Sequence, residues 1–187
     1  MAKKKIILGF TGLIACGKDT ASDYFAEKYG AKQIKFSSSM KDIMDRVYIS
    51  PVRKNYQVLS KILRESFGQD LFSKVVSKDV KSLDASLIIV DGVRRIPDID
   101  FLKDIEGFKL IAVEVAAKTR FERIKKRNEK PGDTTKTWED FQKEDVAETE
   151  ITIPDLMKQA DITIDNNGTL EEFYHNIDIM LKEKFLL

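Results

Sequence analysis

A glycine-rich stretch near the start of the chain has the residue types and spacing that bind phosphate. Gly12, Gly17 and Lys18 follow the pattern G-x-x-x-x-G-K. The two glycines let the backbone turn tightly, so that its N–H groups and the positive end of the next helix surround an anion. The ammonium group of Lys18 adds a mobile charge at the outer phosphates. The pattern therefore predicts a nucleoside triphosphate site; a glycine turn with an incidental lysine is the alternative.

The expected phosphate contacts run from this loop into the first turn of the helix that follows. They are Gly12, Ala15, Cys16, Gly17, Lys18, Asp19 and Thr20. Asp19 departs from the pattern, because Ser or Thr ordinarily offers a hydroxyl to magnesium at that position. As an anion, Asp19 would strengthen a metal site and slightly oppose the phosphates. We interpret Cys16 as a small packing side chain within the loop.

A second candidate for metal binding stands at the end of an apolar segment. Residues 87–91 read Leu-Ile-Ile-Val-Asp, a composition typical of a strand buried in a parallel sheet. A carboxylate at the end of such a strand, beside a phosphate-binding loop, is placed to hold magnesium. Asp91 and Asp19 are therefore the predicted metal ligands. The alternative for Asp91 is a cap on the turn that follows.

Cationic and hydroxyl residues follow two of the predicted strands and could bind a second substrate. Arg94 and Arg95 come directly after the segment just described, and Ser37 and Lys41 follow a strand at 31–36. Open α/β sheets bind ligands at the carboxyl ends of their strands. We expect Arg94 to orient an acceptor as a bidentate fork, with the other three residues beside it. The serine could equally cap a helix.

Three arginines, spaced three and four residues apart, share one face of a predicted basic helix. They are Arg120, Arg123 and Arg127. A loop and an acidic helix follow, and the whole segment of about 118–150 is typical of a hinged lid. We expect these arginines to be catalytic together with Lys18, closing over a transferred phosphoryl group where charge spreads over its oxygens. We also expect Glu144 and Asp145 of the acidic helix to pair with the basic helix.

Composition limits the classes of protein to which the chain can belong. It has 187 residues, of which 42% are hydrophobic, and a formal net charge of +1. Neither nucleic acid nor a membrane is therefore expected as a partner. No apolar run approaches the ~20 residues of a membrane span. The one cysteine allows no internal disulfide, which suits a reducing compartment, and we expect a cytoplasmic protein.

Apolar segments alternate with helical patterns along the whole chain. Predicted strands lie at 6–11, 31–36, 87–91, 110–115 and 160–165. The alternation predicts a three-layer α/β fold with an about five-stranded, mostly parallel sheet, in a single domain spanning 1–187. Residues of about 37–83 form a helical acceptor insert with a bend at Gly68. Its arginines, Arg64 among them, are candidates for substrate contact, although most surface arginines are merely solvated.

Several of these segments resemble the small P-loop kinases. Residues 8–18 look like the start of a dephospho-CoA kinase, and residues 160–166 with the helix after them look like the same family. The variant Gly-Lys-Asp-Thr at 17–20 is similar instead to deoxynucleoside monophosphate kinases of the phage type and to phosphomevalonate kinases of the animal type. The resemblance implies a P-loop NTPase fold and ATP with Mg²⁺ as the phosphoryl donor. It also implies adenine contacts from Arg123, Asn166 and Gly168.

A missing carboxylate bears on the kind of acceptor. Transfer to a sugar hydroxyl, as in a dephospho-CoA kinase, is helped by a base that accepts the proton. The resemblance to that family would require aspartates after the second strand. Here residues 35–38 read Lys-Phe-Ser-Ser, and no carboxylate follows until Asp42. An acceptor that already carries a phosphate needs cations instead, which Lys41 and the arginines supply.

We therefore favour an ATP-dependent kinase of the nucleoside monophosphate kinase type, acting on a small phosphate-bearing acceptor, namely a (deoxy)nucleoside monophosphate. A dephospho-CoA kinase and a phosphomevalonate-type kinase remain alternatives. A P-loop protein that senses nucleotide without turnover is an alternative of a different class, against which the three lid arginines argue. The identity of the acceptor and the oligomeric state are left open by the sequence.

Overall fold

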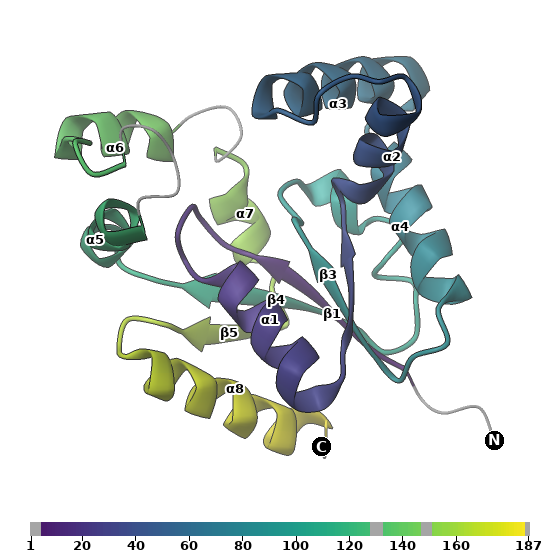
Figure 1. The fold of residues 1–187 in the computed structure, drawn as a ribbon. Coiled ribbons are helices and arrows are strands. Elements are labelled where there is room, and N and C mark those ends of the chain that lie inside the picture. Colours follow the sequence, from purple (N-terminus) through teal and green to yellow (C-terminus); the bar gives the residue numbers. More distant parts are fainter. Residues whose placement is uncertain (1–4, 128–132, 147–150, 186–187) are drawn as a thin grey trace.

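Five parallel strands form one sheet in the computed structural model, which describes residues 5–127, 133–146 and 151–185 (Figure 1). The strands are β1 (Ile6–Thr11), β2 (Lys32–Lys35), β3 (Leu87–Asp91), β4 (Phe108–Glu114) and β5 (Ile162–Asp165). Their order across the sheet is β2-β3-β1-β4-β5, and every neighbouring pair is parallel. The predicted strands are confirmed, and within the described ranges the sheet is wholly parallel.

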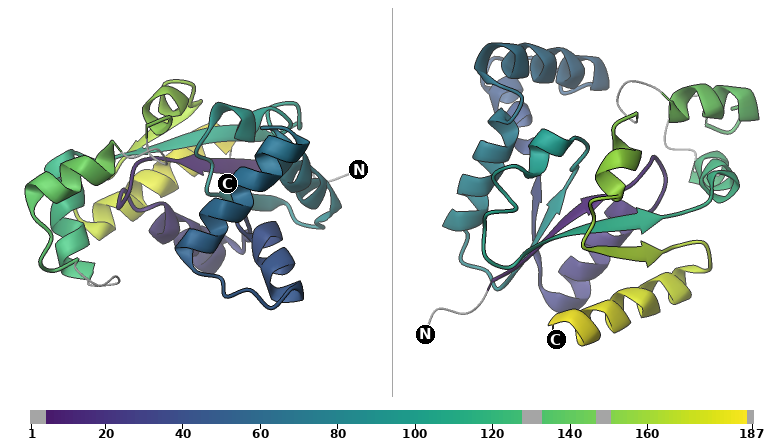
Figure 2. Two further views of the ribbon diagram at one scale, coloured as in Figure 1. Left: turned by 90° about the horizontal axis from the view of Figure 1, so that it is seen from above. Right: turned by 180° about the vertical axis from the view of Figure 1, so that it is seen from behind.

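Helices cover both faces of the sheet and give the predicted three layers (Figure 2). One face carries α1 (Lys18–Tyr29) and α8 (Leu170–Phe185). The other carries α4 (Leu71–Ser82), the 3-10 helix η1 (Ile96–Ile99) and α7 (Ile153–Met157). Because both faces are covered, the central strands are mostly apolar, and every residue of β3 is buried.

Successive residues of a strand point into opposite layers of the core. Leu8 of β1 packs in one apolar cluster with Phe25 of α1 and Phe173 of α8. Its neighbour Ile7 packs in the other cluster, with Phe72 of α4. Fully burying one such side chain contributes roughly 1.5–3 kcal/mol to the stability of the fold. These two clusters therefore hold the carboxyl ends of the strands in a fixed geometry.

Two helical segments stand beyond the carboxyl ends of the strands, on opposite sides of the molecule (Figures 1 and 2). One consists of α2 (Ser38–Arg46) and α3 (Arg53–Phe67), and the other of α5 (Ala117–Arg127) and α6 (Trp138–Asp145). The predicted insert also included α4, which instead covers the sheet, but these two segments lie within the predicted insert and lid. That they act as an acceptor insert and a lid stays a prediction.

Local sequence signals account for several ends of these helices. Gly68 separates α3 from α4 with a φ of +105°, a conformation that favours glycine, so the predicted bend is confirmed. Thr137 caps α6, because its Oγ1 accepts the N–H of Asp140 at 3.1 Å. The sequence patterns did not indicate α7, although Pro154 in its first turn was an available signal.

The described helices are short compared with a membrane span. The longest of them, α8, has 16 residues. None of the helices in the described ranges combines the length and the apolar composition needed to cross a bilayer.

Candidate functional site

The loop between β1 and α1 has a backbone conformation that requires its glycines. Gly12 has a φ of +149°, and a Cβ there would lie 2.6 Å from Sγ of Cys16 and 2.7 Å from the carbonyl oxygen of Val113. Gly17 precedes α1 with a φ of +98°, and a Cβ there would lie 2.5 Å from Nδ2 of Asn166. The loop is therefore packed closely against β4 and the segment after β5, at the amino end of α1, where helix N–H groups favour an anion.

The ammonium group of Lys18 is folded back over this loop. Its Nζ donates to the carbonyl oxygens of Gly12 at 2.6 Å and Leu13 at 3.3 Å, and to Sγ of Cys16 at 3.4 Å. The thiol itself is buried, as expected for a packing side chain. The carbonyl groups hold the lysine beside the loop, and its flexible stem lets it turn to an incoming phosphate oxygen.

Two carboxylates, the predicted metal ligands Asp19 and Asp91, lie near this lysine. Asp91, at the end of β3, is 8% exposed. Burial raises its pKa, and the negative charge of Asp19 raises it further, while Lys18 and Lys35 oppose the shift. A nearby cation would stabilise both ionised groups, so the pair suits a divalent ion that binds oxygen.

The composition of the pair fits magnesium. Magnesium in proteins commonly takes one or two carboxylates, with the remaining positions filled by water and substrate phosphates. In the part of the chain that the structure describes, no group of three or more His, Cys, Asp or Glu gathers to form a complete protein cage. Asp19 and Asp91 therefore remain the candidate ligands for a magnesium ion that arrives with a phosphate group.

The backbone after β3 is fixed from two sides. Oδ2 of Asp98 accepts the N–H groups of Arg94 at 3.1 Å and Arg95 at 3.0 Å. On the opposite side, Oγ1 of Thr152, just before α7, donates to the carbonyl oxygen of Arg94 at 2.8 Å. The side chain of Arg94 is exposed. Both predicted acceptor arginines thus extend from a held backbone at the carboxyl edge of the sheet.

Arg64 does not have the role that the sequence suggested for the arginines of the insert. Its side chain is buried, and Nη2 donates to Oδ1 of Asp98 at 2.8 Å. The prediction that Arg64 contacts the substrate is therefore wrong, because its N–H donors are occupied inside the protein. Asp98 was missed by sequence reasoning; the only local signal was its position after Pro97 in a short helical turn.

Ser37 and Lys41 were predicted to bind the acceptor, and the structure places both at the start of the insert. Ser37 precedes α2 but makes no side-chain cap to it. Lys41 is exposed and pairs along α2 with Asp45 at 2.5 Å. This carboxylate raises the pKa of Lys41. A role at the acceptor site would require the lysine to leave that solvent-exposed pair, which stays a prediction.

Arg120 joins the two helices of the lid segment. Its side chain is 3% exposed, and Nη1 and Nη2 donate to the two carboxylate oxygens of Asp145 at 2.5 and 2.8 Å. Nη1 also lies 3.5 Å from the carbonyl oxygen of Ile14 in the phosphate loop. The predicted pairing of basic and acidic helices is confirmed here. It is wrong for Glu144, whose carboxylate pairs with Lys136, in the turn before α6, at 2.7 Å.

Arg123 points to a different part of the site. Its Nη2 donates to the backbone and side-chain oxygens of Asn166 at 2.8 and 3.2 Å and to the carbonyl oxygen of Gly168 at 3.5 Å. Nδ2 of Asn166 donates in turn to the carbonyl oxygen of Cys16 at 2.8 Å. The three residues predicted to contact adenine therefore lie together and are linked to the phosphate loop. The side chain of Arg127 lies outside the described part of the structure.

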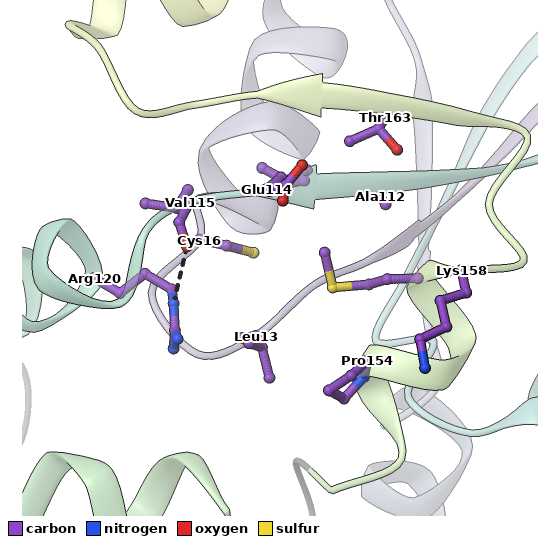
Figure 3. A pocket seen from close by; sticks show the side chains of 11 residues that line it. Leu13, Cys16, Ala112, Glu114, Val115, Arg120, Pro154, Lys158 and Thr163 are labelled. Carbon is purple, nitrogen blue, oxygen red and sulfur yellow. Dashed lines mark hydrogen bonds between the residues drawn. The ribbon is translucent and has the colours of Figure 1, made fainter.

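A cavity of about 370 Å³ opens beside the phosphate loop (Figure 3). Leu13 and Cys16 line it from the loop, Met157 from α7, and Arg120 from α5. Figure 3 shows the guanidinium group of Arg120 at one side of this space, where Nε donates to the carbonyl oxygen of Val115 at 3.3 Å. The cavity borders the site on the sheet face that α7 covers.

Proteins similar in sequence cover nearly the whole chain. The sequence model of a family described as "AAA domain" matches residues 11–142. The "UPF0200 protein" of Hyperthermus butylicus is 30% identical over 169 residues, which are 90% of this chain and 89% of that protein. The protein with the same description from Staphylothermus marinus is 30% identical over 180 residues, which are 96% of this chain and 93% of that protein.

Solved structures of similar fold include small kinases. A shikimate kinase from Bacteroides thetaiotaomicron has a TM-score of 0.62 with 15% identity, over 97% of this chain and 99% of that chain. A gluconokinase from Sinorhizobium meliloti has a TM-score of 0.55 with 13% identity, over 94% and 90%. At these identities the likeness concerns the fold alone. On the family match and the sequence identity, the chain belongs to the AAA domain family and to the UPF0200 proteins.

Proposed function

We propose that this protein is an ATP-dependent phosphotransferase that moves the γ-phosphoryl group of ATP to a small phosphate-bearing acceptor. The class of acceptor that we favour is a (deoxy)nucleoside monophosphate. The observation that carries the proposal is the presence of arginines on both sides of the phosphate loop. Arg94 and Arg95 follow β3, and Arg120 and Arg123 come from α5. Two phosphate groups brought together need this excess of positive charge.

The roles of the residues follow from their positions. Lys18 and the N–H groups of the loop hold the β- and γ-phosphates. Asp19 and Asp91 would hold a magnesium ion that arrives with ATP, and that ion would neutralise charge on those phosphates. Arg120 presents two N–H groups in the fork geometry that suits a phosphate as well as a carboxylate. Arg123 and Arg127 complete the lid, whose closure excludes water and so limits hydrolysis of ATP.

The surroundings of β2 support an acceptor that carries its own phosphate. The residue after this strand is Phe36, which is buried in the apolar core, and Ser37 follows it. The carboxyl end of β2 therefore offers no carboxylate that could serve as a base toward a hydroxyl group. Arg94, by contrast, is exposed on a held backbone and can bind an anionic acceptor.

An acceptor panel tests the proposal directly. The purified protein is incubated with ATP and magnesium, and formation of ADP is followed with and without deoxynucleotides, ribonucleotides, dephospho-CoA or phosphomevalonate. ADP that appears only with a nucleoside monophosphate supports the proposal. ADP that appears only with dephospho-CoA or phosphomevalonate assigns one of the alternative kinases. Binding of ATP with no turnover in any mixture would identify a nucleotide sensor and overturn the kinase.

Replacement of Lys18 should have the largest effect on turnover. We expect Lys18→Ala to lower the rate of phosphoryl transfer by roughly 10²–10³-fold, because one preorganised donor to developing charge is worth that much. The fold should persist, since the Nζ atom of Lys18 is bound only by loop carbonyl oxygens and the thiol of Cys16 in the hydrogen bonds described above. Steady-state kinetics and circular dichroism measure the two effects. Lys78→Ala, on exposed α4 surface, is the matched control, and full activity of Lys18→Ala would refute the site.

Arg94 should act on the acceptor and not on ATP. We expect Arg94→Ala to raise the KM for the acceptor by roughly 10–100-fold, the value of a hydrogen-bonded charge, while the KM for ATP stays unchanged. Lys182→Ala, which removes an exposed cation of α8, serves as the control. A change in the KM for ATP alone would show that the assignment of Arg94 is wrong.

A further inference from the structure

The carboxylate of Asp98 connects two parts of the molecule that are far apart in sequence. Its Oδ2 accepts the N–H groups of Arg94 and Arg95, and its Oδ1 accepts Nη2 of Arg64 from α3 at 2.8 Å. Asp98 itself is 1% exposed. One buried group therefore fixes the backbone of the two acceptor arginines and the helix of the insert together.

Arg64 is held as firmly as its partner. Nη1 donates to the carbonyl oxygen of Gln69 at 2.6 Å, and Nε donates to Oγ of Ser60 at 3.3 Å. The guanidinium carbon lies 4.8 Å from the ring centroid of Phe72 in α4. Both ends and one face of the guanidinium group are thus occupied, so α3 cannot shift without disturbing Asp98.

Stability alone does not explain a buried ion pair at this place. Well-packed apolar residues of similar volume often stabilise a core as much or more, because burying two charges is costly. What the charged pair adds is direction: the carboxylate must face two backbone N–H groups, and the guanidinium must face the carboxylate. This orientation matters because the backbone of Arg94 and Arg95 must be held where it presents their side chains to the acceptor.

We propose that Arg64 and Asp98 are positioning residues, through which the position of α3 sets the backbone geometry of Arg94 and Arg95 for the acceptor. The proposal rests on the acceptor role of those two arginines in the proposed function. It adds that the insert and the acceptor arginines move as one unit. Thr152, which donates to the carbonyl oxygen of Arg94, ties the same backbone to the start of α7.

The variant Asp98→Asn separates the two links of this carboxylate. The amide oxygen of asparagine can still accept the N–H groups of Arg94 and Arg95. Its NH₂ group would face Nη2 of Arg64, so that two donors meet and the link to α3 is lost. Asp100→Asn is the matched control, because Asp100 lies two residues away and pairs with Lys103 at 3.1 Å on the exposed surface.

Kinetics on the wild type and both variants form the first measurement, with ATP and each of the ribonucleoside and deoxynucleoside monophosphates as acceptor. We expect Asp98→Asn to raise the acceptor KM by roughly 10–100-fold, the size of effect that a small misplacement of a binding group produces. The KM for ATP should stay within about twofold, and Asp100→Asn should match the wild type. An unchanged acceptor KM in Asp98→Asn, at a temperature where it is fully folded, would show a merely structural pair.

Backbone amide hydrogen exchange gives a readout that needs no acceptor. In Asp98→Asn we expect exchange at 93–95 and in α3 to rise together by roughly 10-fold or more, because both segments lose a shared tether. A rise in only one of the two segments would overturn the coupling. If the wild type transfers phosphate to none of the acceptors, the proposed function fails, yet the exchange result still decides whether Asp98 couples α3 to the arginine backbone.

Discussion

Two arginine–aspartate pairs stand on opposite sides of the phosphate loop, and they differ in how their carboxylates are held. In the Arg64–Asp98 pair, the side chains are 8% and 2% exposed. In the Arg120–Asp145 pair, the arginine is equally buried at 3%, but the aspartate is 20% exposed. Asp98 also binds two backbone N–H groups, whereas Asp145 is the last residue of the short helix α6.

The difference teaches how one chemical pairing can serve as a fixed brace or as an exchangeable contact. Asp98 is fixed by groups that no ligand can replace. Asp145 contributes only a carboxylate, and a phosphate oxygen offers the same acceptor to the two N–H groups of Arg120. The acceptor side of the site is therefore expected to stay in place, while the lid side is expected to exchange Asp145 for a phosphate.

The largest effect should come from breaking the brace. We expect Arg64→Ala to lower the free energy of unfolding by about 3–5 kcal/mol, because the buried carboxylate of Asp98 loses its charged partner. Asp145→Ala should cost less, because the freed guanidinium group of Arg120 lines the cavity beside the phosphate loop, where water can solvate it. Urea unfolding at neutral pH measures both. Lys61→Ala, on the exposed surface of α3, is the control, and equal losses in the two pairs would remove the distinction.

A smaller effect should appear in kinetics when the lid contact is weakened. If Asp145 competes with phosphate for Arg120, Asp145→Asn should lower the KM for ATP by roughly fivefold, a shift of about 1 kcal/mol in favour of the bound form. Added salt should narrow the gap between variant and wild type, because it screens the competing charge. The matched control is Glu144→Gln, whose carboxylate pairs with Lys136 instead. A higher KM in Asp145→Asn would mean that Asp145 orients Arg120 for the phosphate.

The parts of the fold and site that depend on neighbouring residues could be predicted from the sequence. The phosphate loop, the apolar strand ending at Asp91 and the cap at Thr137 each need only a short stretch of chain. The alternation of strands and helices then leaves few arrangements besides a parallel sheet with two covered faces. Once the strands are parallel, their carboxyl ends lie at the same edge of the sheet. Asp19 and Asp91 are therefore close enough for the charge of Asp19 to raise the pKa of Asp91.

The parts that depend on distant residues could not be predicted. Arg64 and Asp98 are 34 positions apart, and no local pattern distinguishes a buried arginine from a solvated one. The spacing of Arg120 and Arg123 placed them on one face of a helix, but their partners, Asp145 and Asn166, come from different later segments. Periodicity gives the direction of a side chain from its own helix, whereas tertiary packing decides which group it meets.

The smallest effect on the free energy of unfolding should come from an aspartate on the sheet face that α1 and α8 cover. Its carboxylate is more exposed than those of Asp98 and Asp145, so it adds a third case to the comparison. Asp178 of α8 accepts hydrogen bonds from Lys28 at 2.7 Å, Tyr29 at 2.7 Å and Tyr24 at 2.9 Å, all from α1. Its side chain is 32% exposed. Burial favours the neutral form, but the three donors outweigh it and hold the pKa of Asp178 below the usual 3.8.

The sign of the pH effect follows from that lowered pKa. The stabilisation by Asp178 is fully present above the unfolded value of 3.8 and is lost as the pH falls through the lower folded value. We expect Asp178→Asn to cost about 0.5–1 kcal/mol at pH 7, the range for an exposed ion pair, and to approach the wild type in acid. Urea midpoints at neutral and acidic pH test this, with exposed Asp155→Asn as control. If carboxylate exposure sets the free energy of these contacts, breaking the contact by replacing one partner should cost most for the Arg64–Asp98 pair, less for the Arg120–Asp145 pair and least for Asp178. A larger loss of unfolding free energy at Asp178 than at Asp98 would contradict that order. It would also remove the physical basis for distinguishing the fixed brace from the exchangeable contact.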